Sequence, residues 1–335
     1  MKILNNSISK HVLVVFCFII FAQLFYYPSL SGLKLLQSDI VQYSGMSRQI
    51  KEYRSQNGGK ETYWIDNAFG GMPTYQLGAK YPADFLGVIH DLFRLIPRPA
   101  YLLFLYLFST YILFLVLKVD WKIAILGSFA FGLSTYLLII IQVGHNTKAM
   151  ALAYMPFALA GFFLLIDKKW LIGFFLSVLG LGLNIRANHY QMSYYLLFIL
   201  IILGLVYTYQ AYRSKKLQST LKSIGLYGLA GFLALGLNAT PLLSTSEYSS
   251  FSTRSGSELT LNIDGSKKNI SDGLDYNYIT EYSYGIFESL SLIIPRVQGG
   301  GSRENLGTDS KFYDCLVKKG LSLIHISEPT RPSQI

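Results

Sequence analysis

The sequence predicts an all-α membrane protein that crosses the bilayer several times, and three observations point to this class. Of 335 residues, 51% are hydrophobic and only 14% are charged, whereas soluble domains carry about 25% charged residues. Apolar stretches with the length of a membrane helix recur along the chain. Basic residues are concentrated in every second segment that joins these stretches, which is typical of a multi-pass protein.

Seven stretches have the composition of a membrane helix, for which about 20 mostly apolar residues are needed. The first ends in aromatic residues, "YYPSLSG", and no small-residue cleavage site follows it. We therefore expect a retained helix there rather than a signal peptide. The seven predicted spans are 12–30, 100–117, 122–142, 149–166, 169–186, 191–209 and 223–243.

The distribution of Lys and Arg predicts the orientation, because short cytoplasmic loops are enriched in these residues. If the N-terminus is cytoplasmic, the short outer turns hold only Lys148 and Arg186. The inner segments then hold ten basic residues: Lys2, Lys10, Lys118, Lys122, Lys168, Lys169, Arg213, Lys215, Lys216 and Lys222. The bias of ten to two predicts a cytoplasmic N-terminus.

This topology divides the chain into an N-terminus with the first span, 1–30; a first extracytoplasmic loop, 31–99; spans two to seven, 100–243; and a second extracytoplasmic segment, 244–320. In the first loop we expect a short helix at 47–53, turns at 57–59 and 70–73, and a helix lying on the membrane surface at 85–95. In the second, "IFESLSLIIP" is apolar but too short to span, and predicts a re-entrant or surface-lying segment.

The last fifteen residues, "LSLIHISEPTRPSQI" at 321–335, resemble the translated read-through of a sequencing adapter. We expect this tail to be non-native, and the natural protein to continue beyond about residue 320.

Composition also excludes some classes of function. The formal charge of +10 does not indicate nucleic-acid binding, because much of the basic excess lies in short loops between apolar spans. The two cysteines, Cys17 and Cys315, exclude a disulfide scaffold and a cysteine-based metal cluster.

Polar residues gather on the predicted outer face, each close to the end of a span. Ionisable residues near a membrane are costly and mark functional sites by default. The inner loops have basic residues and two aspartates but no cluster of His and Asn. The candidate site residues are Asp39, His145, Asn146, Lys148, Arg186, Asn188, His189, Gln191, Glu247 and Arg254.

Simpler roles exist for several of these residues. Asp39 is also suited to cap a helix that begins at Ile40, and Lys148 to anchor a helix end at the interface. His145 and His189 could satisfy buried carbonyl groups. Histidine, amide and carboxylate groups could instead hold a divalent cation such as Mg²⁺ or Mn²⁺, although no recognised metal-ligand spacing is present. The basic residues could bind a phosphate.

Six segments together resemble the bacterial YfhO-type membrane proteins, from about residue 10 to 310: "LQSDIVQY", "FGGMPTYQ", "GHNTKAMALAYMP", "NHYQMSYYL", "TRSGSELTLN" and "EYSYGIFESLSLIIP". That family is similar to the C-type glycosyltransferases, polytopic enzymes that take a sugar from a polyprenyl-phosphate carrier on the outer face. The resemblance implies a bacterial cytoplasmic (inner) membrane location and a catalytic acid at Asp39. The motif here has a single Asp in "SDI" rather than an acidic pair, which argues against a metal-bridging role for Asp39.

The resemblance and the layout together predict a glycosyl transfer to an envelope glycan or lipid acceptor. Asp39 would be the general base, and Lys148, Arg186 and the two histidines would stabilise the lipid phosphate. Two alternatives remain: a transporter or flippase of an amphiphilic, lipid-linked anion, and a non-catalytic protein of envelope assembly. Transporters place polar groups at the bilayer midplane on broken helices, whereas these spans are almost free of charge.

Overall fold

The computed structural model describes residues 7–252 and, beyond them, 276–281, 283, 285–294, 297 and 311–318. The chain forms two compact units, Met1–Asp275 and Tyr276–Ile335. In the described residues the only strands are the two-residue β1 (Trp64–Ile65) and β2 (Met72–Pro73), which pair antiparallel. The predicted all-α class is confirmed.

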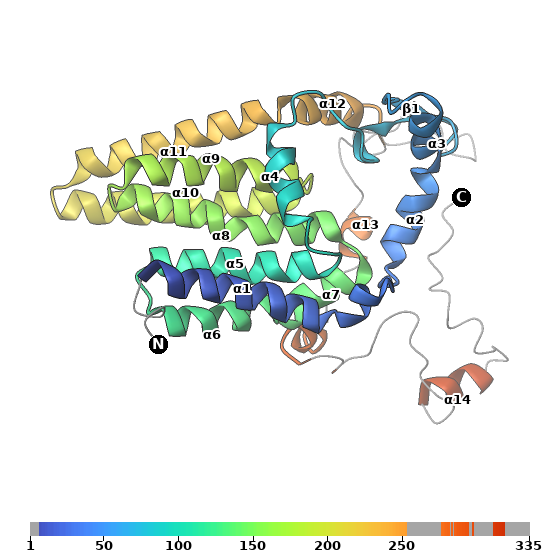
Figure 1. Cartoon of the computed structure of the whole chain (residues 1–335), viewed down its shortest axis with the longest axis horizontal. Coiled ribbons are helices and arrows are strands. Elements are labelled where there is room, and N and C mark those ends of the chain that lie inside the picture. Colours follow the sequence, from blue (N-terminus) through green and yellow to red (C-terminus); the bar gives the residue numbers. More distant parts are fainter. Residues whose placement is uncertain are drawn as a thin grey trace. The chain divides into compact units, whose positions relative to one another are not determined.

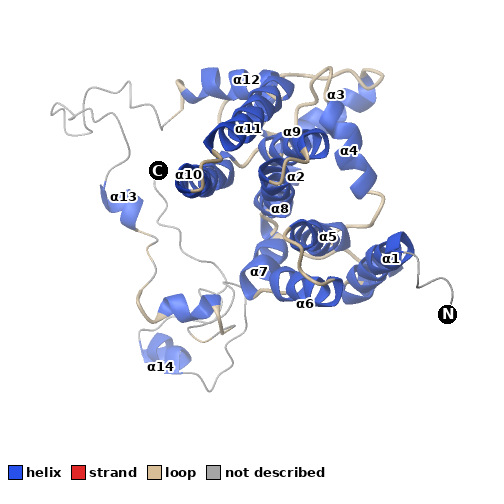
Figure 2. Cartoon of the chain, turned by 90° about the vertical axis from the view of Figure 1, so that its left-hand side faces the viewer, coloured by secondary structure: helices blue, strands red, loops and turns tan. Residues whose placement is uncertain are grey.

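The first unit is a bundle of apolar helices, with α5, α8 and α9 packed side by side and α1, α6, α7, α10 and α11 around them (Figures 1 and 2). Their bounds are α1 (Ser7–Phe25), α5 (Ala100–Val116), α6 (Trp121–Gly132), α7 (Thr135–Val143), α8 (Asn146–Ile166), α9 (Trp170–Arg186), α10 (Tyr190–Arg213) and α11 (Leu217–Leu237).

Within the described residues, four of these helices are long and apolar enough to cross a membrane: α1, α8, α10 and α11. The pair α6 and α7 would make a fifth span, bent by 49° at its break. Helices α5 and α9 are equally apolar but shorter, with 17 residues each. A multi-pass membrane protein is therefore supported.

Three boundaries differ from the sequence prediction. The first span ends at Phe25 rather than near residue 30, because Pro28 lies in the first turn of a separate 3-10 helix, η2 (Tyr27–Ser31). The predicted span 122–142 is two helices, broken after Gly132, a residue type that lowers helix stability. The last span ends at Leu237, and the chain continues as α12 (Ala239–Ser249).

The centre of the bundle is held together by small residues on α8 and α9. A Cβ added to Gly180 would lie 2.4 Å from the backbone nitrogen of Ala158, and one added to Gly161 would lie 2.6 Å from that of Ser177. Such close backbone approach is how membrane helices associate where no water drives them together. Polar side chains add bonds between helices, such as Asn238 Nδ2 donating to the carbonyl oxygen of Gly182 at 3.1 Å.

The helix connections gather at two opposite ends of the bundle (Figure 1). One end, which we call the basic end, has the start of α1 and the connections α5–α6, α8–α9 and α10–α11. The other, which we call the turn end, has the connections α7–α8 and α9–α10.

The loop of residues 31–99 is folded and leaves the turn end through α2 (Ser38–Met46) (Figure 1). It continues as α3 (Arg48–Gln56), β1, β2, η3 (Thr74–Gln76) and α4 (Phe85–Phe93). The predicted helix at 47–53 lies within α3, and the predicted surface helix at 85–95 is α4. The expected turns at 57–59 and 70–73 are present, with φ between +61° and +118° at their four glycines.

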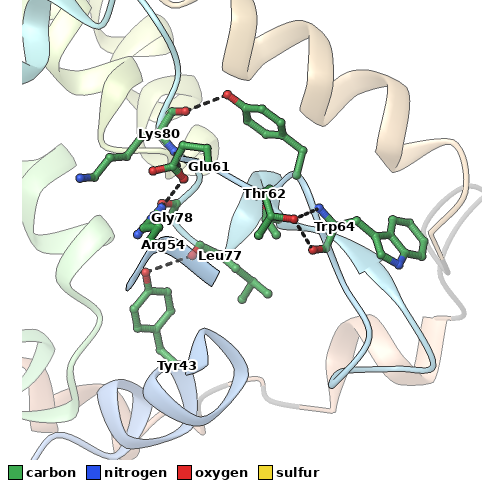
Figure 3. Close-up of polar contacts among 10 residues, drawn as sticks. Tyr43, Arg54, Glu61, Thr62, Trp64, Leu77, Gly78 and Lys80 are labelled. Atoms are coloured by element: carbon green, nitrogen blue, oxygen red, sulfur yellow. Dashed lines mark hydrogen bonds and ion pairs between the residues drawn. The ribbon is translucent and has the colours of Figure 1, made fainter. Parts of the chain in front are cut away.

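A small core and a partly buried ion pair fix the shape of this loop. Ile50 and Ile65 are 1% and 0% exposed and pack with three further apolar residues, Ala68, Met72 and Leu77. The Arg54 guanidinium lies 2.5 Å from Glu61 and also donates to the carbonyl oxygen of Gly78 (Figure 3). The loop is therefore a defined element that can position residues beside the turn end.

The second unit contains α13 (Tyr276–Thr280), the 3-10 helix η4 (Glu288–Leu292) and α14 (Lys311–Lys318). The stretch "IFESLSLIIP" includes η4. The predicted site residue Arg254 and the tail 321–335 lie outside the described residues.

Candidate functional site

The turn "GHN" between α7 and α8 lies against the first residues of α2. Helix α7 ends because Gly144 adopts a left-handed conformation, with φ of +99°. A Cβ at this position would lie 2.9 Å from the Cβ of Gln37 and 3.3 Å from Ile40 Cγ1. Glycine is therefore required here twice, once for the backbone conformation and once for the close approach.

A buried amide pair locks α2 onto this turn. The side chains of Gln37 and Asn146, 109 positions apart, donate to each other's carbonyl oxygens at 3.3 and 3.4 Å. Gln37 also donates to the carbonyl oxygen of Ile141, and Ser38 Oγ to that of Val143. Both amide residues are buried, with 7% and 6% exposure. The predicted site residue Asn146 thus has a positioning role.

This packing brings Asp39 and His145 together. Asp39 Oδ2 lies 3.3 Å from His145 Nε2, and both side chains are about half exposed, at 44% and 48%. The alternative role of Asp39 as a helix cap is wrong: α2 begins at Ser38, its N-cap is Gln37, and Asp39 lies in the first helical turn. Its carboxylate faces solvent beside an imidazole and is favoured by the helix dipole.

Lys148 and His189 complete the group at the turn end. Lys148 lies in the first turn of α8, with Nζ 5.2 Å from the centre of the Tyr136 ring. His189 is the N-cap residue of α10. Burial lowers the pKa of His189, and the positive charges of Lys148 and His145 lower it further. The lowered pKa favours the neutral imidazole of His189. The start of α8, with His145 and Lys148, and the start of α10, with His189, lie at the same end of the bundle (Figure 1).

Arg186 has a different setting from the one predicted. Two nitrogens of its guanidinium, Nε and Nη2, donate hydrogen bonds to the Asp84 carboxylate, and the Nε–Oδ1 distance is 2.8 Å. Asp84 also caps α4 by accepting a bond from the backbone nitrogen of Gly87 at 2.9 Å. Burial opposes ionisation of Asp84, but the pairing with Arg186 outweighs it and lowers the pKa of the carboxyl group. Arg186 therefore fixes α4 on the end of α9.

The other predicted site residues are distributed around this group. Asn188, at φ of +59°, donates to Gln76 Oε1 at 2.9 Å, and Gln76 donates in turn to Thr245 Oγ1 at 2.7 Å. Gln191 donates to the hydroxyl of Tyr195 within its own helix. Glu247 lies exposed near the end of α12. Of the predicted set, the structure brings together Asp39, His145, Asn146, Lys148 and His189.

The predicted divalent cation has few ligands at this position. Within the described residues, no group of three or more His, Cys, Asp or Glu side chains could hold a metal ion. Asp39 and His145 would supply two ligands, and Mg²⁺ usually combines one or two protein carboxylates with substrate phosphates and waters. A cation at this position would therefore need its remaining ligands from a substrate or water.

Sequence reasoning missed Gln37, Asp84 and Gln76. Gln37 stands directly before "SDI", so its place next to the predicted acid was visible. Asp84 precedes an apolar stretch with helical spacing, and this is an N-cap signal. Its pairing with Arg186, 102 positions away, had no local signal.

Comparison with known proteins finds no matching family model, no matching curated protein and no matching solved structure.

Proposed function

We propose that this protein is a membrane glycosyltransferase, with its active site at the turn end on the outer face of a bacterial cytoplasmic membrane. The observation that carries the proposal is the Asp39–His145 contact of 3.3 Å at the turn end, where Lys148 lies in the first turn of α8 and His189 precedes α10. The resemblance of the "SDI" and "GHN" segments to YfhO-type proteins is a second support. The substrate would be a sugar on a polyprenyl-phosphate carrier.

The proposed topology has seven spans and a cytoplasmic N-terminus. The four long helices and the bent pair α6–α7 account for five spans. Helices α5 and α9 would add two, since 17 apolar residues lie within the range found for membrane helices. The basic end would face the cytoplasm, because it has most of the basic loop residues.

In the proposed reaction, an acceptor hydroxyl attacks the anomeric carbon, and the bond from this carbon to the phosphate oxygen breaks. The proton of the hydroxyl passes to Asp39, and the carrier leaves as polyprenyl phosphate. A carboxylate positioned beside the hydroxyl can accept this proton. His145 would orient the carboxylate, and the tethered imidazole would limit its rotation.

The leaving phosphate needs positive charge close to it. Lys148 is the best candidate, because among the described residues its ammonium group contacts a tyrosine ring and forms no ion pair. Arg186 is already neutralised by Asp84, so its contribution would be to hold α4 in place. A bound Mg²⁺ or Mn²⁺ would add positive charge between Asp39 and the phosphate.

One observation favours a transporter or flippase as the second candidate. The bent pair α6–α7 is a discontinuous apolar helix, and such helices are typical of transport proteins. Its second half, α7, leads directly into the "GHN" turn. The same basic group could then receive a lipid-linked anion without chemistry.

Vesicles containing the purified protein and a radiolabelled sugar on polyprenyl phosphate would separate these functions. A glycosyltransferase moves label from the carrier into an added envelope fraction. A flippase changes the accessibility of labelled carrier to an external reagent and leaves the sugar on it. If neither signal exceeds that of vesicles without protein, both functions are excluded.

A further inference from the structure

An apolar groove lies between α1 and α6, near the basic end and away from the candidate site. Figures 1 and 2 show these two helices side by side. The groove has a volume of about 220 Å³, less than the roughly 300 Å³ at which small-molecule pockets begin. Its lining is apolar apart from Lys10. Its size and chemistry suit one hydrocarbon chain better than a compact polar ligand.

Aromatic side chains close the groove at its deep end. The Phe129 ring meets those of Phe18 and Phe21 edge-on, at centroid distances of 5.6 and 4.8 Å. From Trp121 at the mouth to Phe129 is eight residues of α6, or about 12 Å along the helix. One leaflet of the hydrocarbon core is about 15 Å deep. The groove therefore extends through most of one leaflet.

The mouth of the groove is positively charged. The ammonium groups of Lys10 and Lys122 lie 5.9 and 5.8 Å from the Trp121 ring. In the part of the chain that the structure describes, neither forms an ion pair, whereas nearby Lys118 lies 2.7 Å from Asp167. The carboxylate at Asp120 caps α6 by accepting a bond from the backbone nitrogen of Lys122. Among the described residues, two lysines without an ion pair thus lie at the mouth, and the nearby carboxylate caps a helix.

We propose that this groove binds an anionic phospholipid of the leaflet at the basic end. One acyl chain would lie in the groove against Cys17 and Phe18. The phosphate would lie between Lys10 and Lys122, and Trp121 would lie at the level of the headgroups, where its ring is favoured. The proposal depends on a bilayer around the bundle and is independent of the glycosyl transfer.

Tryptophan quenching by brominated lipids tests this site directly. The full chain, with Trp64 and Trp170 replaced by Phe, is reconstituted with phosphatidylcholine or phosphatidylglycerol whose acyl chains are dibrominated. A lysine near an anionic surface contributes about fivefold in affinity, so two predict a preference of about 25-fold for phosphatidylglycerol at Trp121. Equal quenching by both lipids would overturn the proposal.

Four variants make the test specific. Replacing Lys10 and Lys122 with Gln should abolish the preference, and replacing both with Arg should keep it. The matched pair Lys168→Gln and Lys169→Gln, exposed at the same end, should leave it unchanged. Cys17→Phe should fill the groove and weaken quenching by both lipids. If the preference persists when both lysines are Gln, or if Cys17→Phe leaves quenching unchanged, the lipid acyl chain does not bind in this groove.

Discussion

The carboxylate of Asp39 and the imidazole of His145 lie 3.3 Å apart, although one follows the first span and the other opens α8. The contact depends on the close packing of Gly144 against Gln37 and on the Gln37–Asn146 amide pair. A histidine and an acid that come from separate segments are thereby fixed in one place. The stability of this junction and the activity of the site can be tested separately.

Replacing Gly144 with Ala should weaken the junction. The left-handed φ of +99° costs an L-residue roughly 1–2 kcal/mol, and the new Cβ would press on Gln37. We expect a lower midpoint of thermal unfolding in detergent. Gly204→Ala in α10 is the matched control, because its Cβ would meet nothing within 4 Å and Ala favours a helix. Equal midpoints for the two variants would show that the turn is not tightly packed.

The Asp84–Arg186 pair should couple α4 to α9. A double-mutant cycle with Asp84→Asn and Arg186→Gln measures the coupling, because Asn can still accept the bond from Gly87. We expect about 1 kcal/mol, since the Asp84 side chain is 41% exposed and water screens the pair. Additive effects of the two substitutions would contradict the pairing.

Stability should fall on mild acidification because of His90. Burial, together with Arg186 and Arg94, lowers the pKa of His90 to about 4, and its Nδ1 lies 2.8 Å from the Tyr154 hydroxyl. The unfolded chain binds a proton near pH 6.5 and the folded chain does not, so stability is full above pH 6.5 and declines towards pH 4. The pKa of Asp84 is also lowered, but protonation of this carboxyl group would reduce the free energy of unfolding only at lower pH.

His90→Gln tests this assignment, because glutamine can still bond to Tyr154 but cannot titrate. Between pH 7 and pH 4 the unfolding midpoint of this variant should fall less steeply than that of the wild type. The difference in slope corresponds to about one proton fewer bound on unfolding. An unchanged slope would assign the pH dependence to other groups.

Membrane orientation can be tested by cysteine labelling of intact cells, with Cys17 and Cys315 replaced by Ser. Lys60→Cys is exposed in the first loop and avoids the left-handed glycine at 58. An impermeant maleimide should label it without permeabilisation. Lys169→Cys at the basic end should react only after permeabilisation. The reverse pattern would invert the proposed topology and place the candidate site in the cytoplasm.

Much of the bundle could be predicted from the sequence, because apolar composition alone determines where a chain can enter a bilayer. The ends of helices were harder to predict. Helix α10 continues to Arg213 through "YTYQAYR", since a helix need not stop where its apolar residues stop. The break after Gly132 could not be predicted from a proline, because none is present there. It lies where the backbone turns at Ser134, the N-cap residue of α7.

The candidate site could be predicted only in part, because the sequence indicates which residues share a face but not which of them are in contact. The predicted topology places Asp39, His145, Lys148 and His189 on one face of the membrane. Which of them meet depends on packing between distant segments, and no local pattern encodes it. Arg186 illustrates the limit: its position was predicted, but its partner Asp84 depends on how the first loop folds back on α9.

The most direct test of the proposed function is sugar transfer by the Asp39→Asn variant. Asparagine keeps the size of the side chain and removes the base, so the protein should insert and unfold as the wild type does. Asp91→Asn is the matched control, because Asp91 is also an exposed acid in the first loop, paired with Arg94 on its own helix. We predict that Asp39→Asn lowers the transfer rate by roughly 10²–10⁴-fold, while Asp91→Asn stays near wild type. Transfer by Asp39→Asn at the wild-type rate would contradict the account.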